Sequence, residues 1–183
     1  MPITEFLERN ARLYPNDVCL VEINPEIKED RRVTWKEYEL IEPSPKTSYR
    51  REITWSVFNE KANRFANLLL QRGIKKGDKV AILMMNGLEW LPIYFGVLKT
   101  GALAVPLNFR YSSDEIEYCV NLAEADVLVF SNPFIGRVEE IADRISKGRL
   151  LIYVGEGCPG FADDYNSLSA NCSSQSPAIP LFE

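Results

Sequence analysis

Histidine is absent from this chain of 183 residues. Its absence removes the commonest general base and the commonest metal ligand of enzymes, and with them every Ser-His or Cys-His nucleophile pair. The cysteines are few and scattered, without C-x-x-C spacing, at Cys19, Cys119, Cys158 and Cys172. We therefore expect neither a transition-metal site nor histidine-dependent nucleophilic catalysis.

Long apolar runs are also missing. No apolar stretch reaches the ~18 residues that a membrane-spanning helix needs, and the start, MPITEFLERN, lacks the basic region and apolar core of a secretory signal. These absences predict a cytoplasmic protein without a transmembrane segment. A count of 21 basic against 26 acidic residues gives a formal charge of −5, which argues against a nucleic-acid partner because such proteins carry a basic face.

What the chain does contain is a series of alternating helices and strands between Ile53 and Gly155. Short apolar stretches predict buried strands at 79–85, 103–107, 126–130 and 150–154. Helical patterns separate these strands along the chain. Buried strands joined by helices predict an α/β fold, namely an open parallel sheet with helices on both faces.

Apolar spacing defines the two central helices. One has a buried face formed by Phe58, Ala62, Phe65, Ala66 and Leu69. Gly73 is expected to end this helix. The other runs from about Leu88 to Thr100 and is apolar almost all round, so we expect it to be buried on every side.

Polar residues are predicted to cap three other helices. Ser112, with Glu115 three residues later, forms a capping box. Thr4 is expected to cap a first helix over residues 3–14, and Asn132-Pro133 a last helix. The inward face of the last helix is predicted to consist of Val138, Ile141, Ala142 and Ile145.

The pattern divides the chain into three parts. Residues 1–50 hold a helix, a strand at 17–23 and a hairpin-like insertion, and residues 51–155 form the parallel α/β subdomain. Residues 156–183 are expected to form a polar tail or linker, with Asp163-Asp164 as turn material. We interpret 24–50 as an elaborated hairpin or insertion, since its Thr34-Trp35 echoes Thr54-Trp55, although chance resemblance of two strand ends accounts for the echo equally well.

Ligands of an open parallel sheet bind beyond the carboxyl ends of its strands. The residues there are Asn86-Gly87, Asn108-Phe109-Arg110, Ser131-Asn132 and Gly155-Glu156-Gly157. None forms a glycine-rich phosphate cradle. Arg110 is the one candidate ligand contact, because a guanidinium just past a strand can reach a phosphate with paired hydrogen bonds. A solvated surface arginine is the alternative.

Three stretches between Arg51 and Ser131 carry a family resemblance. They are RGIKKGDKVA, the block NGLEW…GVLKTGALAVPLN, and the pattern EIEYC…ADVLV. The region resembles the N-terminal region of the AMP-forming acyl-CoA synthetases and their adenylating relatives. The resemblance covers roughly residues 1–155 and is closest in character to the medium- and long-chain fatty-acid CoA ligases.

The resemblance implies an N-terminal subdomain of an adenylate-forming enzyme. Such an enzyme activates a fatty acid or other carboxylate with ATP to an acyl-adenylate, with Mg²⁺ neutralising phosphate charge, and transfers the acyl group to CoA. The family's phosphate loop, nucleotide-binding segments and catalytic lysine lie downstream of the matched region. The resemblance therefore implies a fragment that is inactive alone, with no catalytic residue, no metal site and no tightly bound cofactor.

Little of the family's binding machinery carries over residue by residue. In some CoA ligases an arginine at the position of Arg110 contacts the phosphate of the CoA nucleotide, and Asn108 would line the same neighbourhood. The competing hypothesis is a stand-alone α/β binding or interaction module that has lost catalysis. A fragment would expose apolar surface, so we also expect self-association into a homo-oligomer.

Overall fold

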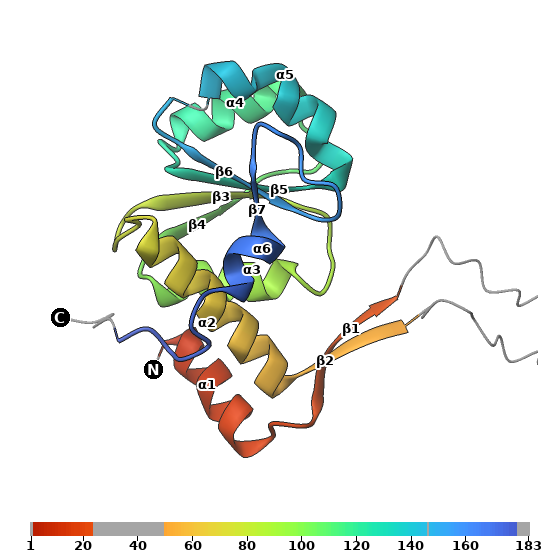
Figure 1. The fold of residues 1–183 in the computed structure, drawn as a ribbon, viewed down its shortest axis with the longest axis vertical. Coiled ribbons are helices and arrows are strands. Elements are labelled where there is room, and N and C mark those ends of the chain that lie inside the picture. The colour runs from red at the N-terminus through yellow and green to blue at the C-terminus, as the bar shows by residue number, and fades with distance from the viewer. Residues whose placement is uncertain (1, 24–49, 146, 179–183) are drawn as a thin grey trace, which may run out of the picture.

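A five-stranded parallel sheet forms the centre of the molecule (Figure 1). The computed structural model describes residues 2–23, 50–145 and 147–178. The strands lie in the order β4-β3-β5-β6-β7. Their bounds are β3 Lys79–Leu83, β4 Leu103–Pro106, β5 Val127–Ser131, β6 Leu150–Val154 and β7 Asp163–Asp164.

Helices cover both faces of this sheet (Figure 1), which confirms the predicted fold class. One face packs against α2 (Trp55–Gln71), α3 (Trp90–Lys99) and α6 (Tyr165–Ala170). The other packs against α4 (Ser113–Leu122) and α5 (Ile135–Ile145). Side chains of β3, β5 and β6 alternate between the two clusters, as the two-residue period of a strand requires. Among the described residues, no helix is long and apolar enough to cross a membrane.

The N-terminal part adds a helix and an antiparallel strand pair. Helix α1 (Ile3–Leu13) is followed by β1 (Val18–Ile23), which pairs with β2 (Arg50–Thr54). The insertion predicted between these strands, including Thr34-Trp35, lies outside the described residues except for Arg50 at the start of β2. Both strands join α1, α2 and α3 in a third apolar cluster centred on Phe58 and Ala62.

Helix α2 is the main support beneath the sheet. Its predicted apolar face is buried throughout at Phe58, Ala62, Phe65, Ala66 and Leu69. The Oγ1 atom of Thr54 accepts the Val57 N–H at 3.4 Å and so caps the start of the helix. The chain leaves the helix through Gly73, whose φ of +85° is readily adopted by glycine.

Helices α2 and α3 approach each other closely at Gly96. A methyl group on Gly96 would lie 2.8 Å from Cδ1 of Phe65 and 3.0 Å from the Ala62 carbonyl oxygen. No residue from Leu88 to Thr100 is exposed, but Trp90, Leu91, Tyr94, Phe95 and Leu98 are only partly buried, so the predicted burial on every side is met in part. The missing side chain at Gly96 is therefore what allows the close contact between the two helices.

The capping predictions are correct at one helix and wrong at two. The capping box of Ser112 and Glu115 is present at α4. At α1, however, Pro2 occupies the N-cap and Thr4 lies buried inside the first turn, so Thr4 caps nothing. Asn132 instead begins a 3₁₀ turn (Asn132–Phe134) that accommodates the fixed φ of proline, and α5 starts only after it.

The prediction of a turn at Asp163-Asp164 is wrong. These residues form β7, which pairs in parallel with β6, and Asp164 then caps α6 by accepting the Ser167 N–H at 2.6 Å. The apolar side chains around them provide the reason, since Tyr165 is only 3% exposed and its ring lies 5.6 Å from that of Phe65. Residues 163–170 thus extend the sheet and its helical layer, while the wider division of the chain at 50 and 155 stays a prediction.

After α6 the chain crosses α2 as a strap, which we define as residues 170–176. Polar side chains of α2 donate hydrogen bonds to the backbone carbonyls of the strap. Asn63 donates to Ser174 and Asn67 to Ser173 and Gln175, at 2.8 to 2.9 Å. Arg64 donates to Ala170 and Cys172, at 3.1 and 2.6 Å. The strap is therefore bound mainly through its backbone, which its polar sequence did not reveal.

Glu8 and Lys99 hold the end of the strap. The Ser176 hydroxyl donates to Glu8 Oε1 at 2.6 Å, and the Lys99 ammonium group donates to the same carboxylate. Burial lowers the pKa of Lys99, which is 2% exposed, although Glu8 opposes this shift. Burial acts to raise the pKa of Glu8, but the hydrogen bonds from Lys99 and Ser176 outweigh it and hold that pKa below its ordinary value.

We predict that Gly96→Ala destabilises the protein by about 1–3 kcal/mol, because the new methyl group forces α2 and α3 apart. Gly136→Ala on α5 is the matched control. It meets open space and should be neutral or stabilising by up to about 1 kcal/mol. Urea unfolding of both variants measures the difference, and equal stabilities would contradict the close-packing argument.

Candidate functional site

The loops that follow four parallel strands lie next to one another at the carboxyl edge of the sheet. In strand order, the residues after β4 (Asn108–Arg110) neighbour those after β3 (Asn86-Gly87). Ser131-Asn132 and Gly155–Gly157 follow, at the ends of β5 and β6. The structure thus brings together the loops that the sequence placed at this edge.

The loop after β4 forms a tight turn that exposes Arg110. The Asn108 side-chain oxygen accepts the Arg110 N–H at 3.0 Å, and the Asn108 carbonyl accepts the Tyr111 N–H at 3.1 Å. The Arg110 guanidinium lies 5.3 Å from the centre of the Phe109 ring. Among the described residues it has no hydrogen bond or ion pair. Asn108 therefore shapes the turn, and Arg110 presents its charge to solvent.

Arg137, on α5, holds this loop from the neighbouring helix. Its Nη1 atom donates to the carbonyls of Phe109 and Tyr111, both at 2.9 Å. Its guanidinium also lies 5.7 Å from the centre of the Phe134 ring. Sequence analysis missed Arg137, because a single charged residue on the outer side of an amphipathic helix gives no signal of a tertiary contact.

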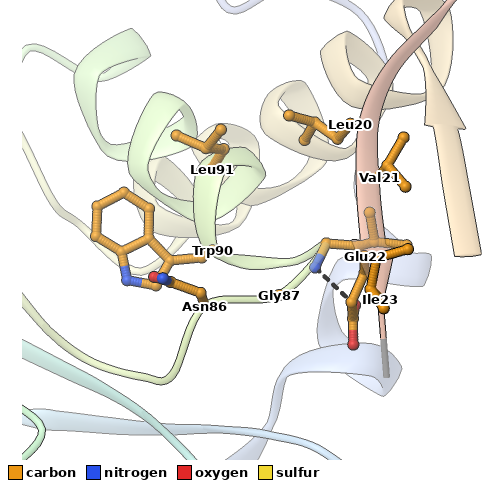
Figure 2. Close-up of a pocket in the computed structure, with 9 residues that line it drawn as sticks. Leu20, Val21, Glu22, Ile23, Asn86, Gly87, Trp90 and Leu91 are labelled. Atoms are coloured by element: carbon orange, nitrogen blue, oxygen red, sulfur yellow. Dashed lines mark hydrogen bonds between the residues drawn. The ribbon is translucent and has the colours of Figure 1, made fainter. Parts of the chain in front are cut away.

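A cavity of about 300 Å³ opens beside the loop after β3 (Figure 2). In the close-up, Asn86 and Trp90 lie on one side and Glu22 and Ile23 of β1 on the other. The complete lining consists of Leu20, Val21, Glu22, Ile23, Asn86, Gly87, Leu88, Trp90 and Leu91. Sequence analysis named Asn86-Gly87 here but not the contribution of β1, which comes from a distant part of the chain.

Glu22, the one carboxylate among the described lining residues, is already paired. Glu22 Oε2 accepts the Leu88 N–H at 3.0 Å and a hydrogen bond from Arg51 Nη2 at 2.8 Å. Glu22 thereby ties the β1–β2 pair to the loop after β3. Its role in the described structure is to join these elements, and it offers no free base for proton transfer.

The ends of β5 and β6 are filled by protein side chains. The Tyr153 hydroxyl donates to the Glu156 carbonyl at 2.8 Å and lies 3.5 Å from Asn132 Oδ1. A side chain on Gly155 would collide with that hydroxyl, at 2.6 Å. Burial raises the pKa of Tyr153, so the phenol stays protonated and acts as a structural donor.

No three histidine, cysteine, aspartate or glutamate side chains converge on a common point in the part of the chain that the structure describes. The described carboxyl edge therefore offers an exposed cation, Arg110, and an apolar cavity. These features suit the binding of an anionic ligand more than proton transfer or metal-assisted chemistry.

Comparison with known proteins identifies related sequences. The family model described as AMP-binding enzyme matches residues 43–178. A medium/long-chain-fatty-acid–CoA/3-oxocholest-4-en-26-oate–CoA ligase of Mycolicibacterium smegmatis is 32% identical over 114 residues, which are 62% of this chain and 20% of that protein. The long-chain-fatty-acid–CoA ligase FadD13 of Mycobacterium tuberculosis is 30% identical over 136 residues, 74% of this chain and 25% of that protein.

Solved structures show the same fold. The crystal structure of the anthranilate CoA ligase AuaEII in complex with anthranoyl-AMP aligns with a TM-score of 0.76 at 23% identity. The alignment covers 96% of this chain and 29% of that one. The chain thus spans about a quarter of the length of the curated relatives and somewhat more of this structural neighbour.

We predict that Arg110→Met changes the free energy of unfolding by less than about 0.5 kcal/mol, because its guanidinium contributes little to the fold. Arg149→Met is the matched control. The Arg149 guanidinium donates to the carbonyls of Ala125, Ile145 and Val120, so its loss should cost about 1.5–3 kcal/mol. Chemical unfolding tests both, and a large loss at Arg110 would identify that residue as structural.

Proposed function

The chain belongs to the family of AMP-binding enzymes, and we propose that it forms the N-terminal part of a fatty-acid–CoA ligase. In the proposed reaction, a carboxylate attacks the α-phosphorus of ATP, which gives an acyl-adenylate and releases pyrophosphate. The CoA thiol then attacks the acyl carbonyl and AMP leaves. The match over residues 43–178 is the observation that carries this proposal. The fatty-acid substrate is supported by the relatives from Mycolicibacterium and Mycobacterium.

Within that enzyme, we assign the described part of the chain a scaffolding role with one ligand contact. Arg110 is proposed to bind a phosphate of the CoA nucleotide, because a guanidinium offers paired donors that match phosphate oxygens. Its exposed position at the carboxyl edge, over the Phe109 ring, supports this assignment. Asn108 is proposed to act on the ligand through the turn, since its side chain holds the Arg110 N–H.

ATP and Mg²⁺ are proposed substrate and cofactor of the whole enzyme. The residues that the structure describes do not fit a magnesium site, because no group of three metal-binding side chains comes together there. We therefore route no chemical step through Mg²⁺ on this chain and assign the chain no catalytic residue. A cytoplasmic location stays a prediction.

The family match and the CoA-ligase relatives favour an enzyme over a stand-alone binding module. Self-association is proposed separately, from apolar side chains that the described surface leaves exposed. On α1 they are Ile3, Phe6 and Leu13, and on α4 they are Tyr118 and Leu122. Burial of such side chains between copies would remove apolar area from water.

We expect the 183-residue chain alone to form no acyl-CoA from ATP, CoA and a fatty acid. It aligns with only 25% of the CoA ligase FadD13, and its described residues bring together no group that could hold Mg²⁺. The measurement is a coupled assay for AMP together with mass spectrometry for the thioester, over carboxylates of several chain lengths. A reaction without CoA and one without ATP are the controls. ATP-dependent thioester formation by this chain would contradict the scaffolding role.

A further inference from the structure

One side chain holds the Arg110 loop through the backbone carbonyls of the two residues that flank Arg110. The Nη1 atom of Arg137 donates to the carbonyl before Arg110, that of Phe109, and to the carbonyl after it, that of Tyr111. Both distances are 2.9 Å, the usual length of an N–H···O hydrogen bond. The two carbonyls of an exposed loop thus converge on one cation.

This contact limits the directions that Arg110 can take. The Asn108 side chain already fixes the Arg110 N–H from within the turn. The peptide before Arg110 is thus held at both ends, because Arg137 also binds its carbonyl, that of Phe109. The peptide after Arg110 is held through the Tyr111 N–H, which donates to the Asn108 carbonyl, so both planes have little freedom to rotate. The fold therefore sets the direction in which the Arg110 side chain leaves the backbone, although its guanidinium is exposed to solvent.

The turn of α5 that carries Arg137 is packed against the hydrophobic core. Its neighbours on α5, Val138 and Ile141, are fully buried in the cluster between the sheet and the helices. Its guanidinium lies near the ring of Phe134, which is also buried.

We propose that Arg137 is the positioning residue for the phosphate contact of Arg110. This inference rests on the proposed function, because it assumes that Arg110 meets the ribose phosphate of CoA. Arg137 acts through the backbone of the Phe109–Tyr111 turn and leaves the contact with the phosphate to Arg110. A loop that already holds its bound conformation loses less conformational entropy when the ligand binds. The affinity for CoA therefore rises without an additional ligand contact.

The expected change in the affinity for CoA follows from the fraction of molecules in which the turn already holds its binding-competent conformation. If the turn without Arg137 holds the competent conformation about one-tenth of the time, the apparent Kd for CoA rises about tenfold. Arg137→Lys retains a cation with several donors and should recover part of this loss. Arg137→Met fills a similar volume without donors and should show the full effect.

The test is a nuclear magnetic resonance titration of this chain with CoA and with dephospho-CoA, which lacks the ribose phosphate. Wild type is compared with Arg110→Met, Arg137→Met and Arg137→Lys. Arg144→Met is the matched control, because Arg144 stands about two turns further along α5 and contacts Glu117 on α4 instead of the turn. Thermal unfolding of each variant reports separately on the fold.

We expect wild type to prefer CoA over dephospho-CoA, and Arg110→Met to lose that preference. Arg137→Met should weaken CoA binding about tenfold while dephospho-CoA binding is unchanged, with Arg137→Lys in between and Arg144→Met like wild type. If Arg110→Met loses the preference but Arg137→Met keeps it, the positioning role is overturned while the Arg110 assignment stands. If Arg137→Met weakens both ligands equally, Arg137 is only structural. If wild type shows no preference, the Arg110 assignment fails and the positioning role fails with it.

Discussion

The close contact between α2 and α3 is the constraint on which the rest of the structure depends. It requires Gly96, because a methyl group there would lie 2.8 Å from the Phe65 ring. With α3 this close, α2 can support the sheet on one side and bind α1, α6 and the strap through its other sides. Two segments from distant parts of the chain, α1 and the stretch from α6 through the strap, thus share α2 as their support, and each depends on the position of α2.

This arrangement leaves the carboxyl edge of the sheet as the part that is free to serve a ligand. At the β5 and β6 ends, Tyr153 fills the space itself. At the β3 end, Glu22 and Arg51 tie the antiparallel strand pair to the loop. At the β4 end, Arg110 stands exposed on a turn held by Arg137. In the described part of this edge, the loops are thus held by carbonyl and carboxylate contacts, while the Arg110 guanidinium makes no hydrogen bond or ion pair.

The sequence predicted the layers of the fold because they follow from apolar periodicity and local end signals. The α2 face from Phe58 to Leu69 and the capping box at Ser112 are of this kind. Sequence analysis failed where an element is held by a residue that lies far away along the chain. Asp163-Asp164 resembles a turn locally but pairs with β6, and a local pattern cannot show that partner. The contacts of Arg137 and of the strap were missed for the same reason, since in both the acceptors are backbone carbonyls, which every sequence offers equally. For the site, sequence analysis predicted that Arg110 lies at the carboxyl edge but not the contacts that orient its loop.

The central claim is that this chain supplies the scaffold of a CoA ligase while the catalytic residues lie in a part of the enzyme that follows it. Reading the source gene through the codon for Glu183 tests this most directly. The account predicts an open frame that continues into a Ser/Thr/Gly-rich loop ending in lysine, the anion-binding element that the reaction with ATP requires. A stop codon immediately after Glu183 would contradict it and would make the chain a stand-alone module.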